Sequence, residues 1–109
     1  MKNLKIYLNY LKNGIDKLDL SKLQKIENII FKKIQENKQI FVCGNGGSAS
    51  VANHFLCDFN KGIKLSSRNK LKPKIMSLSD NMETVLAVGN DISFNKIFSF
   101  QLDNYYSNG

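Results

Sequence analysis

The chain has 109 residues, 42% hydrophobic and 23% charged, a length and composition that suit one compact domain. Its net charge of +7 does not predict a nucleic-acid partner, because 15 of the 16 basic residues are lysines and only Arg68 is the residue that such sites favour. The apolar runs are too short to span a membrane, and lysines interrupt the amino terminus too often for a signal peptide. These features predict a cytoplasmic protein.

The two cysteines give no motif. Cys43 and Cys57 fit neither a CxxC pair nor a zinc-finger spacing. Cys43 lies in an apolar run and Cys57 in a helical pattern, which favours a reduced, partly buried pair over a disulfide.

The amino-terminal third is predicted to hold two helices. Apolar residues recur at steps of three and four from Leu4 to Leu18, which predicts an amphipathic helix that is broken by Gly14 and ends near Asp16. A second helix is predicted to begin at Ser21, which can form a capping box with Gln24. Each helix has one apolar stripe, so we expect the two helices to pair or to pack on another subunit.

The pattern changes after Asn37. Residues 40–43 form a short apolar run, typical of a central parallel strand. A helical pattern follows over 48–60, with Gly62 at the expected cap position. A polar, lysine-rich loop is predicted over 64–74.

A second strand is predicted after Pro73, over 75–78. A short helix is then expected from Asp80 or Asn81 to Val88, and residues 89–91 are expected to break it. Ser93 is predicted to cap a last helix, whose buried stripe would be Phe94, Ile97, Phe98, Leu102 and Tyr105.

This order of elements indicates an α/β fold with a parallel sheet, because such crossovers are right-handed. A parallel layer normally needs more than two strands, with helices on both faces. No third strand is predicted before Gly109. We therefore interpret the chain as the front part of a longer domain. The alternative is a small, complete helical protein with one strand pair.

The strongest chemical signal is the run 43–48 (CGNGGS), between the first strand and the next helix. Glycines let the backbone approach a ligand, and the first amides of a helix are unpaired, so phosphate or another anion is the natural guest. The spacing matches neither GxGxxG nor the P-loop, so we expect no nucleotide cofactor. Ser48 can cap the helix or hold a ligand oxygen. The alternative is a tight turn whose glycines serve packing only.

His54 and Asp58 are four residues apart on the following helix, so they share one face, with Cβ atoms roughly 5 to 6 Å apart. Proton transfer or metal binding can use such a pair. The alternative is an ordinary contact on a helix surface.

The run 41–50 (FVCGNGGSAS), followed by Asn53-His54-Phe55 and then Asp58, resembles the sugar isomerase (SIS) domain. More narrowly, it is similar to the phosphoheptose (sedoheptulose 7-phosphate) isomerase branch. A second match is the run 87–91 (AVGND), followed by Phe94 and residues 97–99 (IFS). The resemblance covers roughly residues 38 to 109.

The resemblance implies a flavodoxin-like, three-layer α/β fold with a parallel sheet, truncated here after the second strand. Residues 1–36 would be an amino-terminal helical oligomerisation segment that joins subunits into a homodimer or homotetramer, and residues 37–109 the front part of the SIS domain. The implied activity is ketose–aldose isomerisation of a phosphorylated sugar of the heptose 7-phosphate type, for the synthesis of surface polysaccharide precursors.

The resemblance also assigns site residues by position. His54 would be a zinc ligand or an acid/base group. Asp58 stands where these isomerases have a glutamate that moves a proton between adjacent carbons, so the two are the candidates for catalysis and for holding zinc. Contacts with the substrate would come from Asn45, Gly46, Gly47, Ser48, Asn90 and Asp91.

Asp58 departs from the family, because aspartate is one methylene shorter than glutamate and withdraws the carboxylate by roughly 1.5 Å. A misplacement near 1 Å costs on the order of a hundredfold in rate. The family's second phosphate-binding loop and its later glutamine and histidine would also lie beyond Gly109. The alternative reading is a non-catalytic module of this fold that binds phosphosugars or a protein partner.

Overall fold

The computed structural model describes residues 2–106 and divides the chain into two compact units, Met1–Phe31 and Lys32–Gly109. The first unit holds α1 (Lys2–Asp16) and most of α2 (Leu20–Gln35). The predicted break at Gly14 is wrong, because α1 continues through this residue, which has open space around it. Among the residues described, no helix is long and apolar enough to cross a membrane.

The apolar stripe of α1 and most of that of α2 are exposed to solvent, whereas Ile34, near the end of α2, is buried. No residue of α1 is buried, and its stripe is about half exposed or more throughout, at Leu4, Leu8, Leu11 and Ile15. The two helices therefore do not bury their stripes on each other, and the first of the two expectations is wrong. Packing on another subunit stays a prediction.

Asp19 caps α2, not Ser21. The Asp19 carboxylate accepts hydrogen bonds from the backbone N–H groups of Ser21 (3.0 Å) and Lys22 (3.1 Å) and from the Ser21 hydroxyl (2.8 Å). Gln24 donates further along the helix, so the predicted capping box is wrong. Ser21 cannot serve as the cap because it already lies in the first turn. The hydrogen bonds from the Ser21 side chain and then from Lys22 lower the pKa of Asp19 below its usual value.

This cap predicts an acid-sensitive α2. The pKa of Asp19 in the folded protein lies below 3.8. The cap therefore stabilises α2 fully above pH 3.8, and this stabilisation is lost as the pH falls through the lowered pKa. Asp19→Ala is expected to have a weaker helical circular dichroism signal at neutral pH and a flatter loss of signal in acid. Asp16→Ala, at the end of α1, is the control. Identical acid titrations of the wild type and Asp19→Ala would contradict this role.

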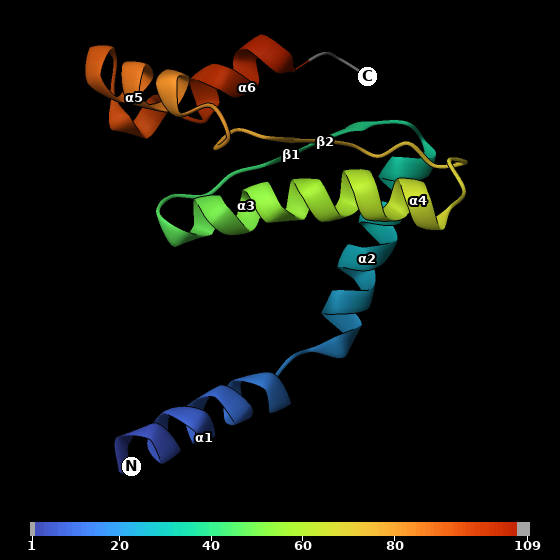
Figure 1. Ribbon diagram of the computed structural model, residues 1–109, viewed down its shortest axis with the longest axis vertical. Helices are drawn as coiled ribbons and strands as arrows, with labels where there is room; N and C mark the ends of the chain where they lie inside the picture. The colour runs from blue at the N-terminus through green and yellow to red at the C-terminus, as the bar shows by residue number, and fades with distance from the viewer. Residues whose placement is uncertain (1, 107–109) are drawn as a thin grey trace. The chain divides into compact units, whose positions relative to one another are not determined.

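The second unit is a small helix–sheet–helix sandwich. Two strands pair in parallel, with Ile40 opposite Ile75. α3 lies on one face of this sheet, and α5 and α6 lie on the other (Figure 1). The elements are β1 (Gln39–Val42), α3 (Gly47–Cys57), the π-helix η1 (Asp58–Ile63), α4 (Lys64–Ser66), β2 (Lys74–Ser77), α5 (Met82–Asp91), the 3-10 helix η2 (Phe94–Lys96) and α6 (Ser99–Tyr105). This arrangement confirms the predicted α/β fold class.

The core of this unit is small and comes from both layers of helices and the sheet. Its buried apolar side chains are Ile34, Ala52, Ile75, Leu78, Val88 and Ile97. At roughly 25 cal/mol per Å² of apolar area, so few buried side chains leave a modest margin of stability.

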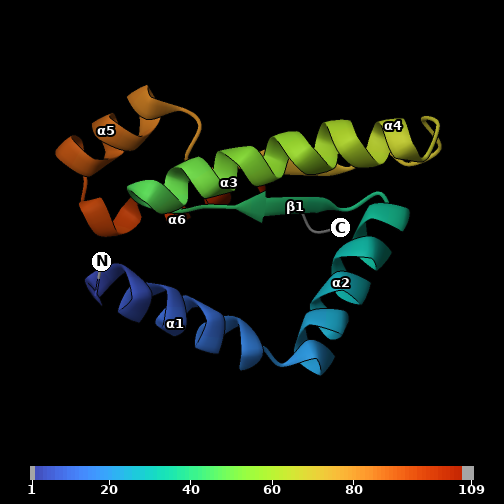
Figure 2. The ribbon, with the colours of Figure 1, turned by 60° about the horizontal axis from the view of Figure 1, so that its bottom comes forward.

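The helical run after the first strand is longer than predicted. α3 passes directly into η1 and α4, which Figure 2 shows as one continuous rod. The predicted cap at Gly62 and the predicted start of a loop at residue 64 are therefore wrong, because the helix continues to Ser66. The chain is turned instead by Arg68 and Asn69, with φ values of 52° and 63°. Gly62 has open space around it, so nothing there forces the helix to end.

Asn81 caps α5, which confirms one of the two predicted starts: its side chain accepts a hydrogen bond from the Thr84 N–H at 2.8 Å. The predicted break at 89–91 is wrong, because α5 continues to Asp91. A Cβ at Gly89 would lie 3.5 Å from the Ile97 side chain, so this glycine permits close packing rather than a break.

Ser93 is an N-cap, as predicted, but it caps η2, and α6 begins separately at Ser99. The interruption changes which side chains face the core. Gln101 is the buried residue of α6, and its Nε2 donates to the carbonyls of Leu78 (2.9 Å) and Ile97 (2.7 Å). Of the predicted buried stripe, the structure buries Ile97 and half-buries Phe98, but it exposes Phe94, Leu102 and Tyr105.

Both cysteines are free, as expected. The expectation of partial burial is wrong, because Cys43 and Cys57 are exposed in the described structure. Cys43 follows the last residue of β1, and Cys57 is the last residue of α3.

Asn60, in η1, closes the outer edge of β2. Its Nδ2 donates to the Ile75 carbonyl at 2.8 Å, and its Oδ1 accepts from the Ile75 N–H at 3.1 Å. One amide side chain thus satisfies both backbone groups that Ile75 turns away from β1. At Ile75 this contact supplies the hydrogen bonds that a neighbouring strand would otherwise make with the open edge of the sheet.

Asn60→Asp is expected to destabilise the protein by about 1–3 kcal/mol, because a carboxylate cannot donate to the Ile75 carbonyl and leaves that acceptor unpaired. Urea unfolding followed by circular dichroism measures the change. Asn95→Asp introduces the same charge on an exposed residue and is expected to be close to neutral. Equal losses in the two variants would show that the charge matters and the contact with β2 does not.

Candidate functional site

The glycine turn, defined here as residues 44–48, follows β1 and opens α3. Gly46 is the N-cap of α3 and has a φ of 54° and a ψ of −126°, a conformation that only glycine adopts readily. The turn is tight, because the Ser48 N–H donates to the Asn45 carbonyl at 3.0 Å. A Cβ at Gly44 would collide with the backbone carbonyl of Ser48. Both glycines are therefore required by the path of the chain.

The start of α3 is exposed to solvent. Asn45, Gly46, Gly47 and Ser48, the four predicted contact residues in this turn, are all exposed. Within the described residues no side chain caps α3, so the predicted capping role of Ser48 is not observed. Backbone N–H groups at an uncapped helix start attract an anion through their partial positive charge.

A serine that the sequence analysis missed holds the first residue of the turn. The Gly44 N–H donates to the Ser79 hydroxyl oxygen at 2.9 Å, and the same hydroxyl donates to the Gly44 carbonyl at 2.8 Å. Ser79 follows β2, so it stands at the carboxyl end of the sheet, where parallel α/β sheets bind their ligands. The available signal was the pair of serines, Ser77 and Ser79, at the end of a strand.

His54 and Asp58 face each other across one turn of helix. His54 Nε2 and Asp58 Oδ2 are 3.4 Å apart, and the two side chains are 78% and 57% exposed. With Ser50, Val51 and Phe55, they line a shallow hollow of about 500 Å³. The predicted juxtaposition of imidazole and carboxylate on one face is therefore present, and a ligand can reach both groups.

A second hollow, of about 280 Å³, links this pair to the glycine turn. It is lined by Val42, Cys43, Ser48, Val51, Ala52 and Phe55. Val51 and Phe55 line both hollows, so one continuous surface runs from Ser48 to the His54–Asp58 pair. At 1.5 Å per residue, His54 is about 9 Å from Ser48 along the helix and Asp58 about 15 Å.

Asn90 and Asp91 lie elsewhere. They are exposed at the end of α5, on the opposite face of the sheet from α3, and the Asn90 side chain donates to the Asp91 carboxylate at 2.8 Å. Neither residue lines the two hollows described above. Their assignment to substrate binding stays a prediction.

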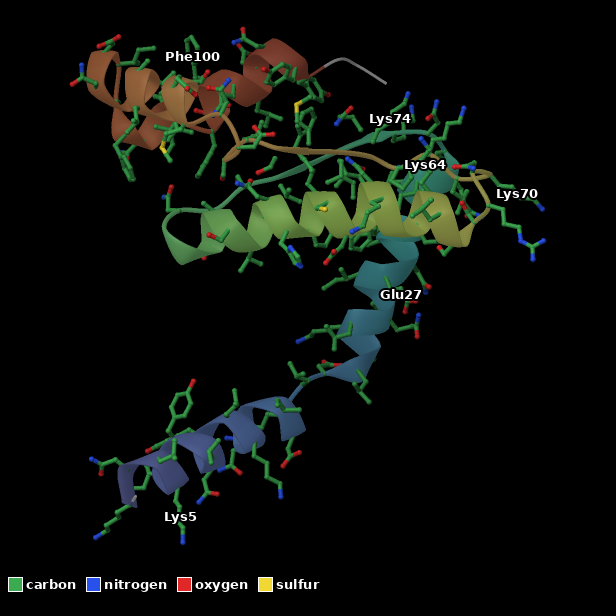
Figure 3. The ribbon with its side chains drawn as sticks, in the orientation of Figure 1. Lys5, Glu27, Lys64, Lys70, Lys74 and Phe100 are labelled. Carbon is green, nitrogen blue, oxygen red and sulfur yellow. The ribbon has the colours of Figure 1, made fainter. Side chains whose placement is uncertain are left out.

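Three of the many lysines lie far from the glycine turn. Figure 3 shows Lys64, Lys70 and Lys74 at the end of the α3–α4 rod opposite to the turn. These three charges therefore do not lie beside residues 44–48.

The His54–Asp58 pair fits half of a zinc site. Two ligands about 2.0–2.1 Å from one tetrahedral ion lie about 3.4 Å apart, which agrees with the 3.4 Å between Nε2 and Oδ2. Imidazole and carboxylate are also donors that zinc accepts. Among the described residues, however, no group of three or more such donors comes together. A closed site would need further ligands.

Comparisons with known proteins identify the family and the fold of the chain. The SIS domain family model matches residues 6–107. The chain is 32% identical over 87 residues to the phosphoheptose isomerase of Helicobacter hepaticus, covering 80% of this chain and 43% of that protein. It is 30% identical over 90 residues to the phosphoheptose isomerase of Clostridium acetobutylicum, covering 83% and 44%. The structure of phosphoheptose isomerase GmhA from Neisseria gonorrhoeae superposes with a TM-score of 0.72 at 23% identity, over 94% of this chain and 50% of that chain.

The chain belongs to the SIS domain family. The superposition supports the α/β fold described above. The chain spans less than half the length of these curated relatives.

Proposed function

We propose that the protein is a phosphosugar isomerase that interconverts a ketose and an aldose of the heptose 7-phosphate type. The observation that carries the proposal is that one helix, α3, presents both an anion-attracting glycine turn and the His54–Asp58 pair. The relatives named phosphoheptose isomerase support the substrate class. In this role the enzyme would supply a precursor of surface polysaccharides in the cytoplasm.

The proposed mechanism assigns binding to the turn and proton transfer to Asp58. Residues 45–48 hold the substrate, with Asn90 and Asp91 as further contacts. The Asp58 carboxylate removes the proton from the carbon next to the carbonyl, which gives a cis-enediolate, and the hydroxyl proton of this intermediate passes from one oxygen to the other. An acid outside residues 1–109 returns the proton to the neighbouring carbon. His54 lies 3.4 Å from Asp58 and orients the carboxylate.

Subunit contacts are the second part of the proposal. The exposed leucine and isoleucine stripes of α1 and α2 are available to join subunits in a homodimer or homotetramer. Burial of these stripes between subunits would stabilise the assembled protein.

The test is an assay of the whole protein with sedoheptulose 7-phosphate, in which product formation supports the proposal. Melting temperatures with and without this compound separate the second candidate, a phosphosugar-binding module without catalysis. The shorter side chain of Asp58 favours that candidate, because the resemblance assigns a glutamate, one methylene longer, to this position. Stabilisation by the sugar phosphate without product would identify the module, and neither stabilisation nor product would refute both.

Zinc is the proposed metal, held by His54 and Asp58 together with donors outside the described residues. When bound, it would polarise the carbonyl of the substrate. Zn²⁺ is expected to raise the melting temperature of the wild-type protein, and this increase is expected to be lost in His54→Ala. Asp103→Ala removes an exposed carboxylate of α6 and is the control. An equal response of the wild type and His54→Ala would exclude His54 as a ligand.

A further inference from the structure

We propose that Ser79 is a positioning residue, whose hydroxyl holds the glycine turn in the shape that receives a ligand. Ser79 follows β2 and is separate from the residues assigned to substrate or metal above. The proposal rests on the proposed function in one respect, namely that the glycine turn binds a sugar phosphate.

The Ser79 hydroxyl takes the place of one more strand residue. The last ladder contact between the strands is the Leu78 N–H donating to the Val42 carbonyl at 2.8 Å. Two residues later, Gly44 directs its N–H and its carbonyl to the same side as Val42, because alternate residues of an extended chain share an orientation. There the Ser79 hydroxyl accepts from the N–H at 2.9 Å and donates to the carbonyl at 2.8 Å. The turn is thereby tied to the sheet beyond the end of β2.

Ser79 is itself held in place from α3. Its backbone N–H donates to the Ser77 hydroxyl oxygen at 3.1 Å, and the Ser77 hydroxyl donates to Asn53 Oδ1 at 2.6 Å. Ser77 is only 2% exposed, so water does not compete for these bonds. Asn53 lies on α3, the helix that the glycine turn opens. The hydrogen bonds therefore run from Asn53 in α3 through Ser77 and Ser79 to Gly44, and the backbone from Gly44 into α3 completes a ring.

This ring makes Ser79 a positioning group rather than a ligand. The single hydroxyl hydrogen of Ser79 is directed to the Gly44 carbonyl, so it is not available to donate to a substrate. Gly44 has no side chain to restrict it, and glycine has the widest choice of backbone conformations. Without Ser79 the turn would sample other shapes, and binding would require ordering it first, which lowers affinity.

The experiment compares the whole protein with Ser79→Ala, Ser79→Thr and Ser66→Ala. Thr keeps the hydroxyl, and Ser66 makes an exposed contact with the Ile63 carbonyl at 3.2 Å, away from the turn. Amide hydrogen exchange measured by NMR is expected to be about tenfold faster at Gly44 in Ser79→Ala. The KM for sedoheptulose 7-phosphate is expected to rise about tenfold with kcat changed less than about twofold, the pattern of lost uniform binding. Ser79→Thr is expected to restore both, and Ser66→Ala to change neither.

The two readouts separate this proposal from the proposed function. Exchange at Gly44 that is unchanged in Ser79→Ala, or equally raised in Ser66→Ala, would overturn the positioning role. Faster exchange with an unchanged KM would show that the shape of the turn does not govern substrate binding, which also overturns it. If the wild type neither binds nor converts the sugar phosphate, the proposed function fails, and the exchange at Gly44 alone decides whether Ser79 holds the turn.

Discussion

Gly44→Ala is expected to destabilise the protein by about 3 kcal/mol and to abolish binding of a sugar phosphate. A Cβ at this position would collide with the backbone carbonyl of Ser48, and a backbone atom cannot move aside as a flexible side chain can. To relieve the collision, the turn must open and α3 must shift. Chemical denaturation measures the loss of stability, and a titration with sedoheptulose 7-phosphate measures the loss of binding.

Gly62→Ala is the matched control for Gly44→Ala. A Cβ at Gly62 would have open space around it, and the residue lies inside a continuous helical run. Replacement of a helical glycine by alanine typically stabilises by about 0.5–1 kcal/mol. Opposite signs are therefore expected for the same chemical change at two glycines. A Gly44→Ala protein as stable as the wild type would refute the tight packing of the turn.

Asp58→Asn is expected to lower kcat for sedoheptulose 7-phosphate by about a hundredfold or more, because the amide cannot accept the proton next to the carbonyl. The amide has nearly the shape of the carboxylate, so the melting temperature is expected to stay close to that of the wild type. Asp103→Asn is the control: it makes the same change from carboxylate to amide at an exposed residue of α6 and is expected to leave kcat unchanged.

Asp58→Glu tests the length of the side chain. Glutamate extends the carboxylate by one methylene, to the reach that the resemblance assigns to this position, so turnover is expected to be retained. Equal turnover in the wild type and Asp58→Asn would remove Asp58 from the mechanism. Loss of turnover in Asp58→Glu alone would indicate that the site is built for the shorter acid.

The sequence allowed prediction of features that depend on local order. An apolar run that ends in glycines predicted β1 and the turn after it, and the spacing of four residues placed His54 and Asp58 on one face, where they lie 3.4 Å apart. Such patterns follow from the periods of strands and helices and need no knowledge of distant residues.

Features that depend on distant partners escaped prediction. Ser79 became significant only when the fold brought it to Gly44, 35 residues earlier in the chain. Gly62 looked like a helix end, but the open space around it allows the helix to pass through, and Arg68 and Asn69 make the turn instead. The resemblance assigns Asn90 and Asp91 to the substrate by motif position; they do not line the two hollows along α3, and their assignment stays a prediction.

The two hydrogen bonds between the Asn60 side chain and Ile75 determine on which side of the sheet a further strand can pair. Because Ile75 has both of its outward backbone groups engaged by Asn60, β2 is a terminal strand at this point. Any strand added to the sheet would therefore adjoin β1, which would become an interior strand. The chain leaving the carboxyl end of such a parallel neighbour would emerge beside Gly44 and could approach an anion resting on residues 45–48 from the other side.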